Sequence, residues 1–314
     1  MESILNKINH KPQFSGKNKT NQENQAIDSP GRIVVRRLIK NKFAMLGLVL
    51  LVVMILFAFI GPWFVDYGYN THSDNIKMPP MEGHILGTDY LGRDMLTRLM
   101  YGGRISILVG VVSVIIEIVI GALIGAIAGY YGGKIDSFLM EITDIFLSLP
   151  FLPIVLILGS ILSDLKVAGG MRIFSLMVIL GVLYWPTVAR LVRGEILSLR
   201  EQEFMQATEA LGLRDTRKII NHLLPNVIPT IIVNATLGIA TAILTESALS
   251  YLGLGVTEPV PSWGNMMTAA NKLADFQKRQ WLWIPPGICI LITVMAVNLF
   301  GDGLRDALDP KMKR

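Results

Sequence analysis

Charge and cysteine are both scarce in this sequence. Only 17% of its 314 residues are charged and 52% are hydrophobic, whereas a soluble domain is nearer a quarter charged. The single cysteine, Cys289, excludes an internal disulfide, and its apolar surroundings predict a small buried side chain. The histidines show no local metal-ligand spacing, so no metal site is expected: they are His10, His72, His84 and His222. This composition favours a polytopic membrane protein over a large soluble core.

Catalytic signatures are also missing. The sequence has no G-x-x-x-x-G-K-[ST] phosphate loop, so it is not expected to hydrolyse ATP by that means. No nucleophile–base pair or metal constellation indicates an enzyme embedded in the membrane. We therefore predict no catalytic residues and no cofactor.

The net charge of +5 does not indicate a nucleic-acid partner. Nine of the lysines and arginines lie in residues 1–42, directly before the first apolar run. Basic residues beside a membrane span mark the cytoplasmic side, so 1–42 is predicted to be a cytoplasmic tail. Its first 30 residues are polar and predicted to be disordered. No secretory signal is expected, because the apolar run that follows is too long for one.

Six apolar runs are long enough to cross a bilayer. They are 43–65, 105–129, 137–162, 173–192, 227–250 and 282–303. An even number of crossings places both chain ends in the cytoplasm, makes 66–104 an extracellular segment and leaves 305–314 as a cytoplasmic tail. The five later spans are predicted to form one domain over 105–304. The whole fold is therefore expected to be an all-α membrane protein.

Local patterns refine three parts of this plan. Gly121, Gly125 and Gly129 recur every fourth residue, which favours a helix face that a neighbouring backbone can approach closely. Pro150 and Pro153 predict a kink or local unwinding in the third span. In the extracellular segment, Asp89 with Arg93 and Asp94 with Arg98 have the i,i+4 spacing of ion pairs on a short surface helix.

The cytoplasmic connection 201–226 carries the strongest functional signal. Phe204, Ala207 and Leu211 form an apolar stripe at helical spacing, and Gly212 interrupts it. A second stripe is expected to end at Pro225, its members being Ile219, Ile220, Leu223 and Leu224. The pattern predicts a helix, a glycine turn and a second helix lying across the membrane face. From the residues alone, docking into a partner's groove and simple adsorption to lipid are equally supported.

The same stretch resembles the EAA loop of the permeases of ATP-binding-cassette (ABC) importers. That pattern is Glu-Ala-Ala, three residues, Gly, nine residues and then Ile-x-Leu-Pro. This chain departs from it with Gln206 for Glu, Thr208 for the second Ala and His222 for Ile, so no acidic residue stands at 206. The resemblance implies a coupling helix that contacts a separate ATPase. The residues it assigns to coupling are Gln206, Ala207, Thr208, Gly212, His222, Leu224 and Pro225.

Further segments are similar to the peptide and nickel permeases of that family. They are HILGTDYLGRDMLTRLMYGGRISI (84–107), ESALSYLGLG (246–255), PSWGNM (261–266) and GDGLRDALDPK (301–311). The likeness covers about 30–314 and is closest to the C-type permease of oligopeptide and dipeptide systems. It implies the type I importer fold in a bacterial cytoplasmic membrane. The implied partners are a second permease, two ATPase subunits and an extracellular binding protein, with peptides as cargo.

Ionisable groups inside spans are functional candidates because burying them in the bilayer is unfavourable. Glu117 in the second span and Glu246 in the fifth are the best placed, and Asn234 adds a polar group for a translocation pathway. For Glu117, a structural hydrogen bond with a neighbouring helix is slightly favoured over contact with the substrate. For Glu246, packing against a partner subunit and lining the pathway are equally open. Glu141 and Asp144, one turn apart, lie where headgroup water can reach them.

Two other functions stay open at this stage. The same machinery could carry nickel or a metal chelate, since a permease need not coordinate its cargo tightly. A standalone secondary transporter would predict an internal hydropathy repeat and broken helices in both halves. The sequence shows no convincing repeat, and that function leaves 201–226 unexplained.

Overall fold

The computed structural model describes residues 30–165, 167 and 169–309. This part of the chain is almost entirely helical and contains no β-strand. The long helices are α2 (Lys42–Phe59), α3 (Met95–Tyr131), α6 (Gly169–Arg200), α9 (Leu224–Tyr251) and α12 (Ile284–Leu308). The shorter ones are α1 (Pro30–Lys40), η2 (Gly61–Phe64), α4 (Gly133–Ser148), α5 (Phe151–Asp164), α7 (Glu203–Ala210), α8 (Asp215–Arg217), the π-helix η3 (Lys218–Leu223), α10 (Trp263–Met266), η4 (Met267–Asn271), α11 (Leu273–Lys278) and η5 (Gln280–Leu282).

The membrane spans agree with the predicted all-α plan. Five helices are long and apolar enough to cross a membrane, and the bent pair α4–α5 makes a sixth if its two halves form one span. The helix that contains the second predicted span extends beyond it. α3 begins at Met95 rather than near 105, because the Asp94 side chain caps its N-terminus by accepting a hydrogen bond from the Thr97 N–H.

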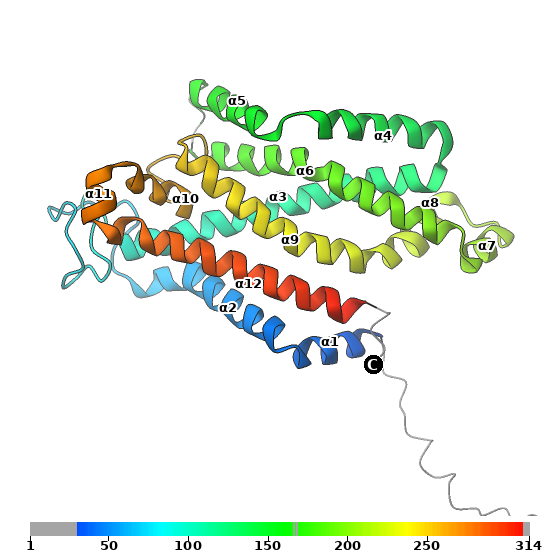
Figure 1. The fold of residues 1–314 in the computed structure, drawn as a ribbon, viewed down its shortest axis with the longest axis horizontal. Coiled ribbons are helices and arrows are strands. Elements are labelled where there is room, and N and C mark those ends of the chain that lie inside the picture. Colours follow the sequence, from blue (N-terminus) through cyan, green and yellow to red (C-terminus); the bar gives the residue numbers. More distant parts are fainter. Residues whose placement is uncertain (1–29, 166, 168, 310–314) are drawn as a thin grey trace, which may run out of the picture.

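The long helices lie side by side in one bundle (Figure 1). α3 packs against α6, α9 and α2, and α12 packs against α2 and α9. α4 and α5 lie along one edge of the bundle, beside α6. α7 and α8 are at one end, here named the α7 end, together with α1 and the last turn of α12. α10, α11 and the loop after α2 are at the opposite end, the α11 end.

The three regularly spaced glycines form the contact between α3 and α6. A methyl group on Gly121 would lie 2.6 Å from Val188 Cβ, and one on Gly125 would lie 2.4 Å from the Ala189 carbonyl oxygen. On Gly129 it would lie 2.9 Å from the Arg193 carbonyl oxygen. Any side chain at these positions would push the two backbones apart. The predicted packing face is therefore confirmed.

The third predicted span is broken at its first proline. α4 ends at Ser148, Pro150 has an extended ψ of 106°, and α5 then starts at an angle of 78° to α4. Pro150 lacks the N–H that would continue the ladder, and the residue before a proline is biased away from helical backbone. The expected kink is confirmed.

The predicted surface helix around residues 89–98 is wrong. Residues 66–94 form loops, and the Asp89–Arg93 ion pair, at 2.6 Å, lies buried in a turn. The Asp94 side chain does not face Arg98 but accepts hydrogen bonds from Thr97 and contacts His84. Spacing of four residues produces a helical pair only where the backbone is helical, and here the chain turns instead.

Two predictions concern residues outside the described part of the chain. The expected disorder of 1–30 falls almost wholly on residues 1–29, and half of the tail 305–314 falls on 310–314. Within the described residues, α1 and the end of α12 lie at the same end of the bundle as α7 (Figure 1). The basic residues of α1, of the 201–226 connection and of the end of α12 therefore lie at one end of the bundle. Cys289 is buried, as expected.

Candidate functional site

α7 ends in a glycine turn at the α7 end of the bundle. Gly212 has a φ of +66°, its N–H donates to the Glu209 carbonyl at 2.9 Å, and the Leu213 N–H donates to the Thr208 carbonyl at 3.2 Å. These two bonds make a Schellman motif, in which a left-handed glycine closes a helix. The predicted helix and glycine turn are confirmed.

α7 divides its side chains between the bundle and its surroundings. Met205 is buried in an apolar cluster with Ile196 and Leu223. The Thr208 hydroxyl is also buried and donates to the Met205 carbonyl at 2.7 Å. α7 is therefore fixed to the ends of α6 and η3 by one face, since burial of these side chains holds it there.

The opposite face of α7 is open. Gln206 and Ala207 are exposed, and Leu211 is 76% exposed although it is apolar. Phe204 is half-buried against the cluster of Met205, so only two members of the predicted stripe remain accessible. Gln206, Ala207 and Leu211 stand out from the bundle on a rigid, capped helix.

The second helix of the connection differs from its prediction. Pro225 does not end it, because η3 leads directly into α9 and residues 215–251 form one continuous span. The turn before the proline is widened: the Leu224 N–H donates to the Ile219 carbonyl, five residues back. A proline at the start of α9 needs no N–H partner, so the widened turn accepts it. His222 and Leu224 are half-buried and Pro225 is exposed.

Polar contacts connect this end of the bundle to α3. The Tyr130 hydroxyl donates to Asp215 Oδ1 at 2.6 Å, although 85 residues separate the two. Arg200 Nη1 donates to the Tyr130 carbonyl at 3.1 Å. Lys218, which is buried, lies 3.7 Å from Asp215. Sequence reasoning missed Tyr130 and Asp215 because no local pattern relates them.

Two of the three predicted pathway residues share a cavity. Glu117 from α3 and Asn234 from α9 line a space of about 230 Å³, together with the hydroxyl groups of Tyr184, Thr187 and Thr241. In the described part of the chain the Glu117 carboxylate accepts no hydrogen bond, and it faces Gly238 on α9. The cavity thus holds an acidic group and several neutral donors and acceptors.

Glu246 does not line that cavity. It is 1% exposed and accepts hydrogen bonds from the hydroxyls of Ser106 at 2.9 Å and Ser250 at 2.7 Å. Ser106 accepts in turn from the Trp263 N–H at 3.2 Å. This carboxylate therefore joins α3, α9 and the start of α10 at the α11 end.

The remaining acidic pair of the third span is peripheral. Asp144 forms an exposed ion pair with Arg190 of α6 at 2.5 Å, and Glu141 is exposed. On the same side, Arg193 Nη2 donates to Asp136 Oδ2 at 2.6 Å. The two pairs join α4 to α6, and an exposed pair such as Asp144–Arg190 contributes at most about 1 kcal/mol.

The α11 end is built on a buried ion network. Arg98 is 2% exposed and bonds Glu258 at 2.9 Å, and it lies 3.5 Å from Asp89. Arg93 bonds the same two carboxylates, at 2.6 Å for Asp89 and 2.5 Å for Glu258. The network joins the loop after α2 to the loop after α9. Sequence reasoning found Asp89, Arg93 and Arg98 but missed Glu258, which has no local partner.

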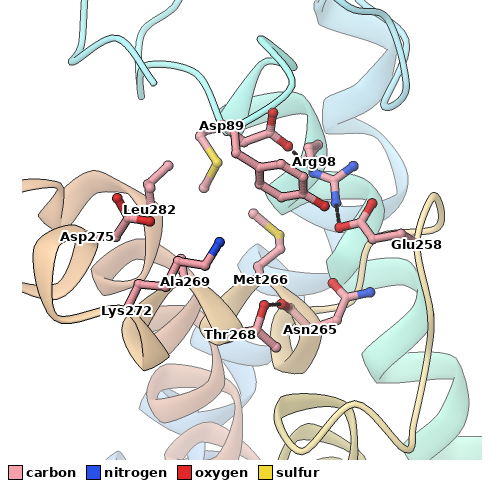
Figure 2. Close-up of a pocket in the computed structure, with 12 residues that line it drawn as sticks. Asp89, Arg98, Glu258, Asn265, Met266, Thr268, Ala269, Lys272, Asp275 and Leu282 are labelled. Atoms are coloured by element: carbon pink, nitrogen blue, oxygen red, sulfur yellow. Dashed lines mark hydrogen bonds and ion pairs between the residues drawn. The ribbon is translucent and has the colours of Figure 1, made fainter. Parts of the chain in front are cut away.

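A second ionic cluster lies on α11. Asp275 is bonded by Arg279, which directly follows α11, and by Lys77 at 3.2 Å, from the loop after α2. Burial alone raises the pKa of the Asp275 carboxyl, but the two cations outweigh burial and hold that pKa below its usual range. Between this cluster and the Arg98 network is a pocket of about 330 Å³ (Figure 2).

Comparison with known proteins places this geometry in context. Residues 121–314 match the family described as binding-protein-dependent transport system inner membrane component. Residues 29–80 match the N-terminal TM domain of oligopeptide transport permease C.

Curated relatives are similar over nearly the whole chain. The dipeptide transport system permease protein DppC of Alkalihalophilus pseudofirmus is 40% identical, over 91% of each chain. The oligopeptide transport system permease protein OppC of Bacillus subtilis is 40% identical, over 87% of each chain. The OppC protein of Haemophilus influenzae is 40% identical, over 88% of this chain and 87% of its own.

Proposed function

This chain belongs to the family of binding-protein-dependent transport system inner membrane components, and on that premise we propose that it is one permease subunit of an ATP-driven importer of dipeptides or oligopeptides. The permeases it resembles carry those cargoes in their names. ATP hydrolysis is assigned to separate subunits, and the chain itself supplies part of the membrane pathway.

The observation that carries this proposal is the outward face of α7. Gln206, Ala207 and Leu211 are exposed on a helix whose other face is packed into the bundle. An exposed apolar face on a short amphipathic helix suits insertion into a groove of a partner protein. Thr208 and Gly212 support that face from behind, the first by anchoring α7 and the second by ending it.

Apolar packing and one hydrogen bond connect α7 to the helices that line the cavity of Glu117. Met205 packs in one apolar cluster with Val188 of α6 and Val227 of α9. Asp215, three residues after the glycine turn, is bonded to Tyr130 at the end of α3. Because α3 and α9 also carry Glu117 and Asn234, a displacement of α7 by an ATPase would shift the helices that line the cavity.

Such a displacement becomes transport only if the partner and the cargo favour different states of the bundle. We assign Glu117 and Asn234 to the pathway, where an acidic group and neutral hydroxyls can hold a peptide backbone or its ammonium group weakly. We assign His222, Leu224 and Pro225, at the junction of η3 and α9, to the support of α7. Glu246 is assigned to the pathway only indirectly, through the loop that it holds.

The orientation follows from charge. Basic residues cluster at the α7 end, in α1, around α7 and α8, and at the end of α12: Arg36, Arg37, Lys40, Arg200, Arg214, Arg217, Lys218 and Arg305. Positive residues beside spans favour the cytoplasmic side. We therefore propose that both chain ends and α7 face the cytoplasm of a bacterial cell, and that the α11 end faces outward to an extracellular binding protein.

The full machine would comprise this chain, a second homologous permease, two ATPase subunits and the binding protein. Co-purification from native membranes in mild detergent tests that composition by mass spectrometry. Reconstitution in proteoliposomes then tests ATP-dependent uptake of labelled peptides, with nickel and a nickel chelate as competing cargoes. Uptake by the chain alone without ATP would instead support a secondary transporter.

A further inference from the structure

The pocket at the α11 end is formed by segments far apart in the sequence. Its walls are Tyr90 and Arg98 on one side, and Lys272 and Asp275 on the other. Apolar side chains such as Met266 and further polar ones such as Asn265 complete the lining. A volume of about 330 Å³ is within the range of small-ligand sites. Polar groups that converge on a partly apolar wall are a feature of such sites.

The acidic side chains in this pocket already have cationic partners. Asp89 is paired with Arg93, and Glu258 is paired with both Arg93 and Arg98. Asp275 is bonded by Lys77 and Arg279. A cationic ligand would have to compete with guanidinium groups held in fixed positions, and that competition is unfavourable.

Lys272 is the exception to this pairing. Its side chain lines the pocket, and its amine nitrogen points toward the middle of the space (Figure 2). Among the described residues it has no carboxylate within ion-pair distance, whereas Lys77 and Arg279 both bond Asp275. A second donor in the neighbouring network, Arg93 Nη2, is buried and without a hydrogen-bond partner in the same part of the chain. Lys272 is therefore a cationic group of the pocket that has no anionic partner among the described residues.

We propose that this pocket binds a carboxylate, and that its source is the free C-terminal carboxylate of a small peptide waiting at the outer face. The Lys272 ammonium would pair with the carboxylate inside the pocket. Met95, Met266 and Leu282 offer apolar surface to a short side chain. This inference depends on the proposed function for the identity of the peptide, but the carboxylate chemistry follows from the pocket alone.

The same chemistry could be supplied by an acidic side chain of the extracellular binding protein. The test therefore measures two affinities of the complex of two permeases and two ATPase subunits. The complex is held in lipid nanodiscs without nucleotide and without the binding protein. Calorimetry gives the affinity for dialanine and for dialanine amide, which lacks the carboxylate. Surface plasmon resonance gives the affinity for the binding protein. The variant is Lys272→Gln, and the matched control is Lys278→Gln, an exposed lysine of the same helix that does not line the pocket.

We expect dialanine to bind about tenfold more tightly than its amide, and Lys272→Gln to remove that preference, as loss of one charge-assisted hydrogen bond would. Lys278→Gln should leave both affinities unchanged. If Lys272→Gln weakens only the affinity for the binding protein, the peptide is ruled out as the source of the carboxylate, and an acidic side chain of the binding protein takes its place.

The proposal is overturned if dialanine and its amide bind equally, or if Lys272→Gln alters neither affinity. ATP-dependent uptake by the unaltered complex is recorded in parallel. Absence of that uptake contradicts the proposed function, whereas normal uptake with no effect of Lys272→Gln contradicts the pocket alone.

Discussion

The two ends of the bundle are held together by different forces. At the α7 end, Met205, Leu223 and Val227 are buried in an apolar cluster, and the main polar link, Tyr130 to Asp215, is exposed. At the α11 end, Arg93 and Arg98 are buried among carboxylates from two separate loops. Apolar packing is non-directional, whereas charge-assisted hydrogen bonds fix both distance and angle.

We expect this difference to make the α7 end movable and the α11 end fixed. An apolar cluster can tilt or slide with little change in buried area, so α7 can transmit a displacement while staying packed. The ionic network cannot move without losing bonds, so the loops at the α11 end keep their shape. Four substitutions test the contrast, from the largest expected effect to the smallest.

The first substitution breaks the fixed end. Arg98→Met would remove the cation between Asp89 and Glu258 and leave the buried Asp89 with one partner fewer. Removing one member of a buried ion network typically destabilises a protein by about 3–5 kcal/mol. We expect a clear fall in the thermal unfolding midpoint of the purified chain in detergent. Lys134→Met, an exposed residue at the opposite end, should leave the midpoint unchanged, and equal midpoints for both variants would show that the network is not what fixes this end.

The same contrast separates what the sequence could predict from what it could not. The spans were predicted from runs of apolar residues, and the α3–α6 contact was predicted from Gly121, Gly125 and Gly129. The helix α7 was predicted from the apolar stripe that Gly212 interrupts. Each of these signals lies within about 25 consecutive residues. Glu258 gave no signal, because its partner Arg98 is 160 residues away, and the contact of Asp275 with Lys77 spans 198 residues.

The differences between expectation and structure have a common cause as well. Pro225 was expected to end a helix but does not, and α3 begins at Met95, ahead of the span predicted from 105. Hydropathy predicts where a segment crosses the bilayer, and the proline rule predicts where the hydrogen bonds of an isolated helix are interrupted. Neither rule takes account of contacts with the rest of the fold. The structure overrides them with a widened π-turn before Pro225 and a side-chain cap at Asp94.

The second substitution tests the movable end. Gly212→Val would place a β-branched residue at a φ of +66°, a backbone conformation that is unfavourable by about 1–2 kcal/mol for residues with a side chain. We expect α7 to lose its end turn, so that ATP-dependent uptake in proteoliposomes falls about tenfold while insertion and the thermal midpoint change little.

Two controls make this result specific. Gly212→Asn should retain most uptake, because asparagine tolerates left-handed backbone better than valine. Gly194→Val, at a helical position of α6 with open space around it, should have little effect. Full uptake by Gly212→Val would remove the reason for assigning α7 to coupling.

The third substitution removes the hydrogen bond between α3 and the connection 201–226. Tyr130→Phe deletes the hydroxyl that donates to Asp215 Oδ1 at 2.6 Å. Because the pair is exposed, we expect a loss of roughly 0.5–1.5 kcal/mol and a decrease of a few-fold in the uptake driven per ATP hydrolysed. The measurement is the ratio of peptide uptake to phosphate release. Asp215→Asn should change that ratio in the same direction, and opposite effects of the two variants would mean that the hydroxyl does not act through Asp215.

The smallest effect concerns pH at the fixed end. The pKa of Asp275 is lowered in the folded protein, so its ion pairs stabilise the fold fully above the unfolded pKa of about 4. That stabilisation is lost as the pH falls through the lowered folded pKa. Asp275→Asn should therefore lower the unfolding midpoint at pH 7 and reduce its further fall between pH 4 and pH 3. Asp74, an exposed residue of the loop after α2, is the control. Asp74→Asn should keep the full fall of the unfolding midpoint between pH 4 and pH 3. An equal fall in both variants would show that Asp275 is not the source of the acid sensitivity.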